Sequence, residues 1–137
     1  MRTLIASLLA GFLLTACQQA ATTDATALLN RDWTLVERAG TAIPLPKPPT
    51  LRLDAAEQRA GGHGGCNRYA GGYVLTRDQL TFTRMAGTRM ACMQGMDVED
   101  KYLADLGRVT HWRLVDGRLE LRAGDQVLLV FASPAAP

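Results

Sequence analysis

Residues 61–73 read Gly-Gly-His-Gly-Gly-Cys-Asn-Arg-Tyr-Ala-Gly-Gly-Tyr, and residues 80–92 read Leu-Thr-Phe-Thr-Arg-Met-Ala-Gly-Thr-Arg-Met-Ala-Cys. Two cysteines, Cys66 and Cys92, bracket the region between them, and glycines crowd its beginning. A glycine cluster in front of a strand indicates a β-bulge or a close approach between two backbones. We therefore expect one of these two features just before Cys66.

Strand-like patterns on both sides of this region predict a mainly β protein. Apolar and polar residues alternate, or apolar residues run together, in short segments at residues 33–37, 50–54, 73–75, 80–83, 110–114, 118–122 and 126–131. Asp116-Gly117 is the signal of a two-residue hairpin of type I′. Seven or eight short strands with closely spaced turns predict a compact antiparallel meander, closed or nearly closed into a small barrel.

One segment, residues 97–107, has the pattern of an α-helix that precedes the last strands. Asp97 is the expected N-cap, and Glu99 and Asp100 place negative charge on the first turn, where the helix dipole favours it. Gly107 suits the position just after the helix. An apolar stripe is formed by Val98, Tyr102, Leu103 and Leu106. We expect the helix to cover one side or end of the sheet.

The composition fits one compact domain without a strongly charged face. A chain of 137 residues with 47% hydrophobic residues can build a single core. Its formal net charge is only +2, whereas a nucleic-acid-binding domain needs a basic face. We therefore expect no nucleic-acid partner.

The amino terminus resembles a bacterial lipoprotein signal. Arg2 precedes an apolar run from Leu4 to Leu14, which is too short to span a bilayer as a stable helix. The run ends in Leu-Thr-Ala-Cys17, which resembles a lipobox. We interpret residues 1–16 as a signal peptide and Cys17 as the acylated first residue of the mature chain. A plain secretory signal with an accidental cysteine is the alternative.

The residue after the cysteine predicts the membrane to which the lipid-anchored protein is sorted. Gln18 rather than Asp follows the cysteine, which in lipoproteins of this kind indicates the outer membrane, with the domain facing the periplasm. Residues 17–27 contain no clear apolar pattern and are expected to form a flexible tether. The folded domain is expected over residues 28–132, with a frayed tail at 133–137.

The motifs Gly-Cys66-Asn67-Arg68-Tyr and Thr-Arg89-Met-Ala-Cys92 resemble the signature of the META domain family, whose bacterial members include HslJ-like heat-shock lipoproteins. The resemblance covers residues 28–132. It implies a compact β-structure with a single helix before the final strands, and a link to envelope or heat stress. It implies no reaction, because the family has no agreed biochemical activity.

The cysteine count suggests a disulfide. Three cysteines minus a lipidated Cys17 leave Cys66 and Cys92 as an even pair in an oxidising compartment. A redox-active thiol pair is the alternative, although the spacing is not Cys-x-x-Cys. Matching cysteines recur in relatives of the family, which agrees with a structural bridge.

The methionines are a second group of sulfur-containing side chains. Met90, Met93 and Met96 follow each other at intervals of three residues, with Met85 upstream and with Cys66, Cys92 and His63 in the same region. Thioether and thiolate ligands select Cu(I), which makes copper handling a hypothesis. Methionine also fills gaps in cores, and we favour that interpretation, with His63 exposed and idle. We expect no metal site and no cofactor.

The polar residues of the two motifs allow a structural and a functional interpretation. Asn67 could cap a turn and Arg68 could form a surface salt bridge, or Asn67, Arg68 and Arg89 could form a small recognition surface. No pattern typical of a catalytic site occurs in the sequence.

We therefore predict a non-enzymatic binding module, held at the membrane by its lipid anchor, with an envelope protein or a small ligand as its partner. Inhibition of an attacking hydrolase such as lysozyme is the first alternative function, and copper or redox handling is the second.

Overall fold

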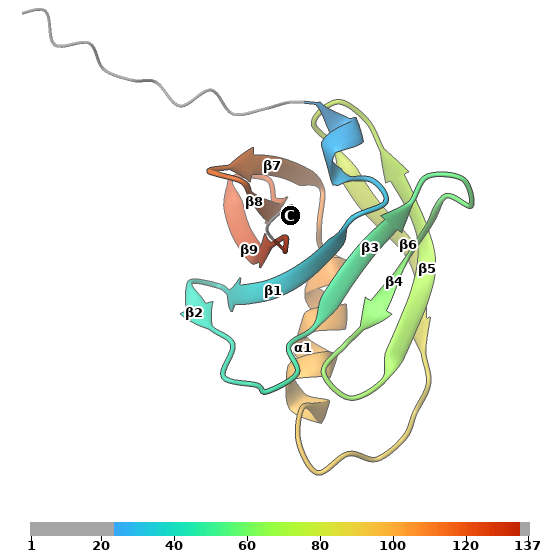
Figure 1. The fold of residues 1–137 in the computed structure, drawn as a ribbon, viewed down its shortest axis with the longest axis vertical. Coiled ribbons are helices and arrows are strands. Elements are labelled where there is room, and N and C mark those ends of the chain that lie inside the picture. Colours follow the sequence, from blue (N-terminus) through green and yellow to red (C-terminus); the bar gives the residue numbers. More distant parts are fainter. Residues whose placement is uncertain (1–23, 135–137) are drawn as a thin grey trace, which may run out of the picture.

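The computed structural model describes residues 24–134. Figure 1 shows a strongly curled sheet with one helix packed along it. The elements are η1 (Ala25–Leu28), β1 (Asp32–Arg38), β2 (Thr41–Ala42), β3 (Thr50–Asp54), β4 (Arg59–His63), β5 (Arg68–Leu75), β6 (Leu80–Gly87), α1 (Met96–Leu106), β7 (His111–Val115), β8 (Arg118–Ala123) and β9 (Gln126–Ala132). No helix in these residues is long and apolar enough to cross a membrane.

All paired strands are antiparallel and belong to one sheet of nine strands, which confirms the predicted mainly β class. The order is β6-β5-β4-β3-β1-β9-β8-β7, and β2 pairs with β1 alone. The ends of the two edge strands meet at an isolated antiparallel bridge between Gln79 and His111. There the N–H of Leu80 donates to the carbonyl of Thr110 at 3.1 Å, and the N–H of Trp112 donates to the carbonyl of Asp78 at 3.3 Å. The sheet is therefore nearly closed rather than closed.

The core lies inside the curled sheet and is completed by α1. The indole ring of Trp33 is fully buried, and its N–H donates to the carbonyl of Leu28 at 3.1 Å. Tyr102 and Leu106 of α1 are also fully buried, and Tyr102 makes an edge-to-face contact with Phe131 at a centroid distance of 6.3 Å. The helix thus adds its apolar stripe to the sheet interior, as its sequence pattern predicts.

The local signal at Asp116-Gly117 predicted a turn correctly. These two residues connect β7 to β8 with φ angles of 51° and 74°, and strands β5 and β6 form a second hairpin. Positive φ at both central residues is the requirement of a type I′ turn. Strand β9 lies between β1 and β8, so it is the central strand that its continuous apolar run suggests.

The helix predicted over residues 97–107 is confirmed to within one residue at each end, but the predicted N-cap was wrong. The helix begins at Met96, after Gly95 in the left-handed conformation with φ 89°, and no side chain caps it. Asp97 is therefore a first-turn residue and not the N-cap. Gly107 has a right-handed φ of −66° instead of a left-handed one. Gly95 takes the N-cap position because a Cβ atom there would collide with the carbonyl oxygen of Gly65.

The folded part begins earlier than the expected boundary at residue 28. Asp24 caps the short helix η1, and its carboxylate accepts hydrogen bonds from the backbone N–H and the hydroxyl of Thr26 at 2.9 and 2.7 Å. These hydrogen bonds lower the pKa of Asp24 below its ordinary value. The last residues of the expected tether are thus ordered, whereas the expected signal peptide and Cys17 lie outside the described residues.

Candidate functional site

The two motif segments of the sequence are joined covalently. Cys66 and Cys92 form a disulfide with a Cα–Cα distance of 5.8 Å, which confirms the predicted bridge. The bond ties the start of β5 to the loop that connects β6 with α1. Because both sulfur atoms are used in the bridge, neither cysteine is a free thiol in this structure.

Asn67 is the polar centre of this junction and not a surface residue. Its side chain is only 4% exposed. Its carbonyl oxygen accepts from the N–H of Met90 at 2.7 Å and from the hydroxyl of Thr88 at 3.1 Å, and its amide donates to the carbonyl of Met90 at 3.2 Å. The side chain therefore satisfies the backbone of a segment more than twenty residues away.

Glu99 completes the junction from the helix side. Its carboxylate accepts hydrogen bonds from the backbone N–H of Cys66 at 3.0 Å, from the backbone N–H of Asn67 at 2.5 Å, and from the side-chain amide of Asn67 at 2.9 Å. A buried carboxylate needs such donors to offset its lost hydration. From the sequence, Glu99 was expected only to place negative charge on the first helical turn. That prediction was incomplete, because the side chain is buried and accepts hydrogen bonds from the segment before β5.

Close backbone contacts explain the glycines in front of the junction. A Cβ atom on Gly64 would lie 2.7 Å from the Glu99 carboxylate, and one on Gly62 would collide with the carbonyl of Thr50. Gly65 has φ 119° and packs against Gly95. The predicted close approach of two backbones is thus confirmed at this position.

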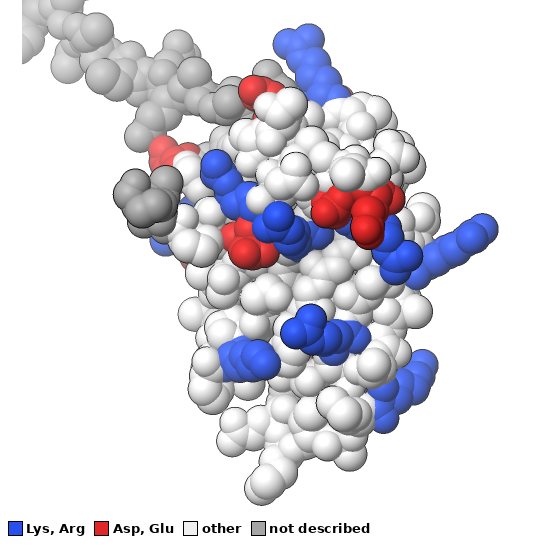
Figure 2. All heavy atoms as spheres, turned by 45° about the vertical axis from the view of Figure 1, so that its right-hand side comes forward, with Lys and Arg blue, Asp and Glu red and all other residues white. Residues whose placement is uncertain are grey.

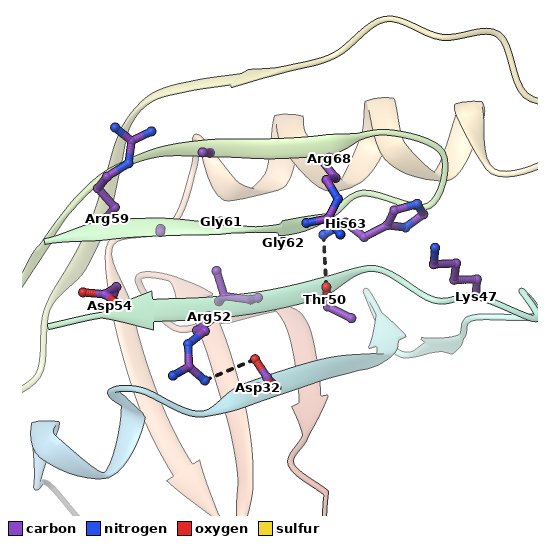
Figure 3. Close-up of a pocket in the computed structure, with 13 residues that line it drawn as sticks. Asp32, Lys47, Thr50, Arg52, Asp54, Arg59, Gly61, Gly62, His63 and Arg68 are labelled. Atoms are coloured by element: carbon purple, nitrogen blue, oxygen red, sulfur yellow. Dashed lines mark hydrogen bonds and ion pairs between the residues drawn. The ribbon is translucent and has the colours of Figure 1, made fainter. Parts of the chain in front are cut away.

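A shallow furrow crosses the outer face of strands β3, β4 and β5. Its main hollow has a volume of about 530 Å³. Figure 3 shows the central strand β4 with Gly61 and Gly62 in its middle, Arg59 at one end, and His63 beside Arg68 at the other end. The middle of the furrow is therefore open because the floor has almost no side chains.

The strand register explains why the cations flank the open floor. Arg52, Gly61 and Ala70 are neighbours across β3, β4 and β5, and they form the middle row. Arg59 lies two residues before Gly61 on the same face, and His63 lies two residues after it, opposite Arg68. At about 3.3 Å per residue, the two cationic rows are about 13 Å apart along the strand.

The furrow continues onto β6. Two adjoining hollows share Arg68, Ala70 and Arg59 with the main one and extend it across Gly71 and Ala86 to Arg84. Figure 2 shows that acidic side chains on this face gather in its upper half, whereas lysines and arginines also occupy the lower half. The whole furrow is thus a basic surface with a floor of glycine and alanine.

Most cations of the furrow have no carboxylate partner within residues 24–134. Arg52 pairs with Asp32 at 3.3 Å, but no ion pair involves Lys47, Arg59 or Arg68. Arg68 therefore does not form the predicted surface salt bridge. Unpaired guanidinium groups around a small-residue floor leave hydrogen-bond donors free for an anionic ligand.

Two of the three residues of the predicted recognition surface are exposed, and the third is buried. Arg68 is exposed on the furrow, and Arg89 is exposed on the loop after β6. Asn67 is buried between them and cannot contact a partner directly. Sequence reasoning missed Arg59 and Arg52, because only the pairing of β3, β4 and β5 places them beside the glycine and alanine floor.

The methionines also differ from the prediction. Met90, Met93 and Met96 are exposed, whereas Met85 packs partly against the core. The interpretation of the first three as core fillers was therefore wrong. His63 accepts a hydrogen bond from the N–H of Gly65 at 3.2 Å through Nδ1. No cluster of three His, Cys, Asp or Glu side chains able to hold a metal occurs among the described residues.

The fold is a small, nearly closed β-barrel with a single helix, and the furrow is a solvent-facing basic surface on it. The sequence matches the META domain over residues 26–135, and the chain belongs to that family. The META domain is not a known family of enzymes.

Two solved structures resemble the chain. One is the NMR structure of a protein from Burkholderia xenovorans, with 28% sequence identity, a TM-score of 0.70, and coverage of 96% of this chain and 100% of that one. A second NMR structure, with 21% identity and a TM-score of 0.63, covers 80% of this chain and 93% of the other, and it supports the fold alone. No curated protein matches the sequence significantly.

Proposed function

We propose that this META domain is a non-catalytic binding module that holds an extended anionic ligand in the furrow across β3, β4, β5 and β6. The observation that carries the proposal is the position of Arg59 and Arg68 at opposite ends of a floor of glycine and alanine, with His63 beside Arg68 and Asp54 opposite Arg59. The main hollow and its extension onto β6 contain Lys47, Arg52, Arg59, Arg68 and Arg84 against Asp32 and Asp54.

The geometry favours a ligand with separated negative groups over a single small anion. The two rows are about 13 Å apart along the backbone, so they can contact two phosphate or carboxylate groups of one chain, whereas a single phosphate would use only part of the furrow. Each exposed contact contributes little by itself, so binding depends on several cations acting together. A linear polyanion is thus the ligand class that uses the furrow fully.

The experiment compares three variants with the same change in net charge. Arg59→Glu and Arg68→Glu alter the two rows, and Arg113→Glu alters an exposed residue of β7 that forms no ion pair within the described residues. Short-chain inorganic polyphosphate, titrated by calorimetry at low salt, should bind more weakly to the first two variants, by about tenfold, and unchanged to the third. If all three variants lost the same polyphosphate affinity, the effect would come from net charge alone, and the proposal would be contradicted.

The location of the protein at the outer membrane is part of the same proposal. Acylation of Cys17 would place the furrow near the outer-membrane surface, where an envelope component or a stress-related partner is the ligand. Mass spectrometry of the membrane fraction should find acyl mass on Cys17. Firm membrane attachment of a Cys17→Ala protein would contradict the anchor without affecting the furrow.

Inhibition of an attacking hydrolase stays a prediction, and an inhibition assay with lysozyme tests it directly.

A further inference from the structure

The loop between β6 and α1 exposes an unusual set of side chains. Five large apolar side chains are markedly exposed in residues 24–134, and three of them are methionines within one seven-residue segment: Met90, Met93 and Met96. Met93 is completely exposed, at 104%. Exposing a group of large apolar side chains to water is unfavourable, so such a group indicates a contact or a ligand.

This loop is anchored at Met90, Cys92 and Gly95. At Met90, both the backbone N–H and the carbonyl are bound by the side chain of Asn67, at 2.7 and 3.2 Å. Cys92 is fixed by its disulfide to Cys66. Gly95 packs against Gly65, and its carbonyl accepts from the N–H of Glu99 at 2.9 Å. The backbone positions of Met90 and Met96 are therefore largely set before any ligand binds, and Met93 lies between the anchored residues Cys92 and Gly95.

The methionine side chains remain adaptable on this fixed backbone. A methionine side chain has three rotatable bonds and a polarizable thioether sulfur, so neighbouring sulfurs can converge on one ion. Because the backbone is already fixed on both sides, ligand binding needs to order only the side chains. The loop thus combines a rigid frame with soft, mobile donors.

The donor set determines the kind of ligand. Thioethers are soft and uncharged, and they favour Cu(I) over hard divalent cations, with Ag(I) as its closest chemical analogue. Thiolates do not compete, because Cys66 and Cys92 are bonded to each other. We propose that Met90, Met93 and Met96 form a thioether site for one monovalent soft cation, Cu(I) or Ag(I).

Silver is the sharper probe because it needs no reductant and so leaves the disulfide intact. The full chain carrying Cys17→Ala, to remove a competing thiol, is titrated with silver nitrate in chloride-free buffer. We expect one Ag(I) per chain by native mass spectrometry. The methyl ¹³C resonances of Met90, Met93 and Met96 should shift, whereas that of Met85 should not.

Two matched variants test the assignment. Met93→Leu keeps an exposed apolar side chain but removes the sulfur, and it should weaken silver binding at least tenfold. Met85→Leu removes a sulfur that packs partly against the core, and silver binding should stay unchanged. Affinity should also be the same at pH 7 and pH 5, because thioethers do not take up protons, whereas imidazole with a pKa of about 6.5 does.

Three outcomes would overturn the proposal. The first is that the protein does not bind silver. The second is that Met93→Leu binds silver as tightly as the unmodified protein. The third is that silver affinity falls at pH 5 and that silver shifts the resonances of His63 or His111. Any of them would identify the exposed methionines as a hydrophobic contact surface and not a metal site. The furrow proposal rests on separate residues, so its outcome is independent of this test.

Discussion

The carboxylate of Glu99 accepts hydrogen bonds from both the backbone N–H and the side-chain amide of Asn67, at 2.5 and 2.9 Å. This pair connects α1 to the start of β5, although the two residues are 32 positions apart. Asn67 in turn holds the backbone of Met90. One buried polar network therefore positions the helix, the first residues of the furrow strand and the methionine loop together.

Glu99→Gln should destabilise the protein by about 1–3 kcal/mol. A glutamine can still accept from the two backbone N–H groups, but its amide nitrogen would then face the amide nitrogen of Asn67, so two donors would oppose each other. Asp97→Asn is the matched control, because it removes one negative charge from the same helical turn at an exposed position. Urea unfolding should show a change below about 0.5 kcal/mol for that control. Equal effects of both substitutions would contradict the network.

Loss of the disulfide should have a comparable or larger effect. The bridge closes a loop with a sequence separation of 26 residues, for which the chain-entropy model gives about 3.5 kcal/mol. A Cys66→Ser, Cys92→Ser double variant should lose stability of this order in urea unfolding while keeping the far-ultraviolet spectrum of a β protein. A loss below about 1 kcal/mol would mean that the surrounding hydrogen bonds alone hold the loop.

The parts of the fold that depend on neighbours in sequence could be predicted. The Asp116-Gly117 turn, the alternating strands and the apolar stripe of α1 follow from local residue preferences. The disulfide was predictable for a different reason, because only two cysteines remain after Cys17 is assigned to the lipid anchor. These features need no knowledge of how distant segments meet.

The candidate site depends on contacts that local patterns do not contain. Arg59 and Arg68 come to the two ends of one open floor only through the pairing of β4 with β5. Likewise, Glu99 has the sequence context of an exposed first-turn acid, and its burial follows from the contact of α1 with Gly64. Methionine is common in cores, so the exposure of Met93 could not be predicted from its type.

Gly62→Ala should be strongly destabilising, because the added Cβ atom would collide with the backbone carbonyl of Thr50. Backbone atoms of paired strands cannot move aside without breaking the ladder between β3 and β4, so we expect a loss of roughly 2–4 kcal/mol. Gly107→Ala is the control. Its φ of −66° suits alanine and its nearest neighbour lies at 3.4 Å, so thermal unfolding should show a neutral or slightly raised melting temperature.

A buried pair of tyrosines should make stability fall in alkaline solution. The hydroxyl groups of Tyr69 and Tyr102 are 2.6 Å apart, and that of Tyr69 donates to the carbonyl of Thr50 at 2.7 Å. Burial raises the pKa of both tyrosines above the ordinary value of about 10. Between that value and the folded pKa, the folded protein therefore keeps protons that the unfolded chain has lost.

The sign of the effect follows from this difference in bound protons. Below about pH 10 both states hold the phenolic protons and the stabilisation is complete, whereas above it the free energy of unfolding falls as pH rises. Each tyrosine adds a slope of up to about 1.4 kcal/mol per pH unit.

Urea unfolding between pH 8 and pH 11 should thus show a free energy of unfolding that is first constant and then falls steeply, and Tyr102→Phe should reduce the steepness by about half. Tyr73→Phe is the control, because Tyr73 is only partly buried and its pKa is raised less. Identical slopes for the unmodified protein and Tyr102→Phe would show that the pair does not control alkaline stability.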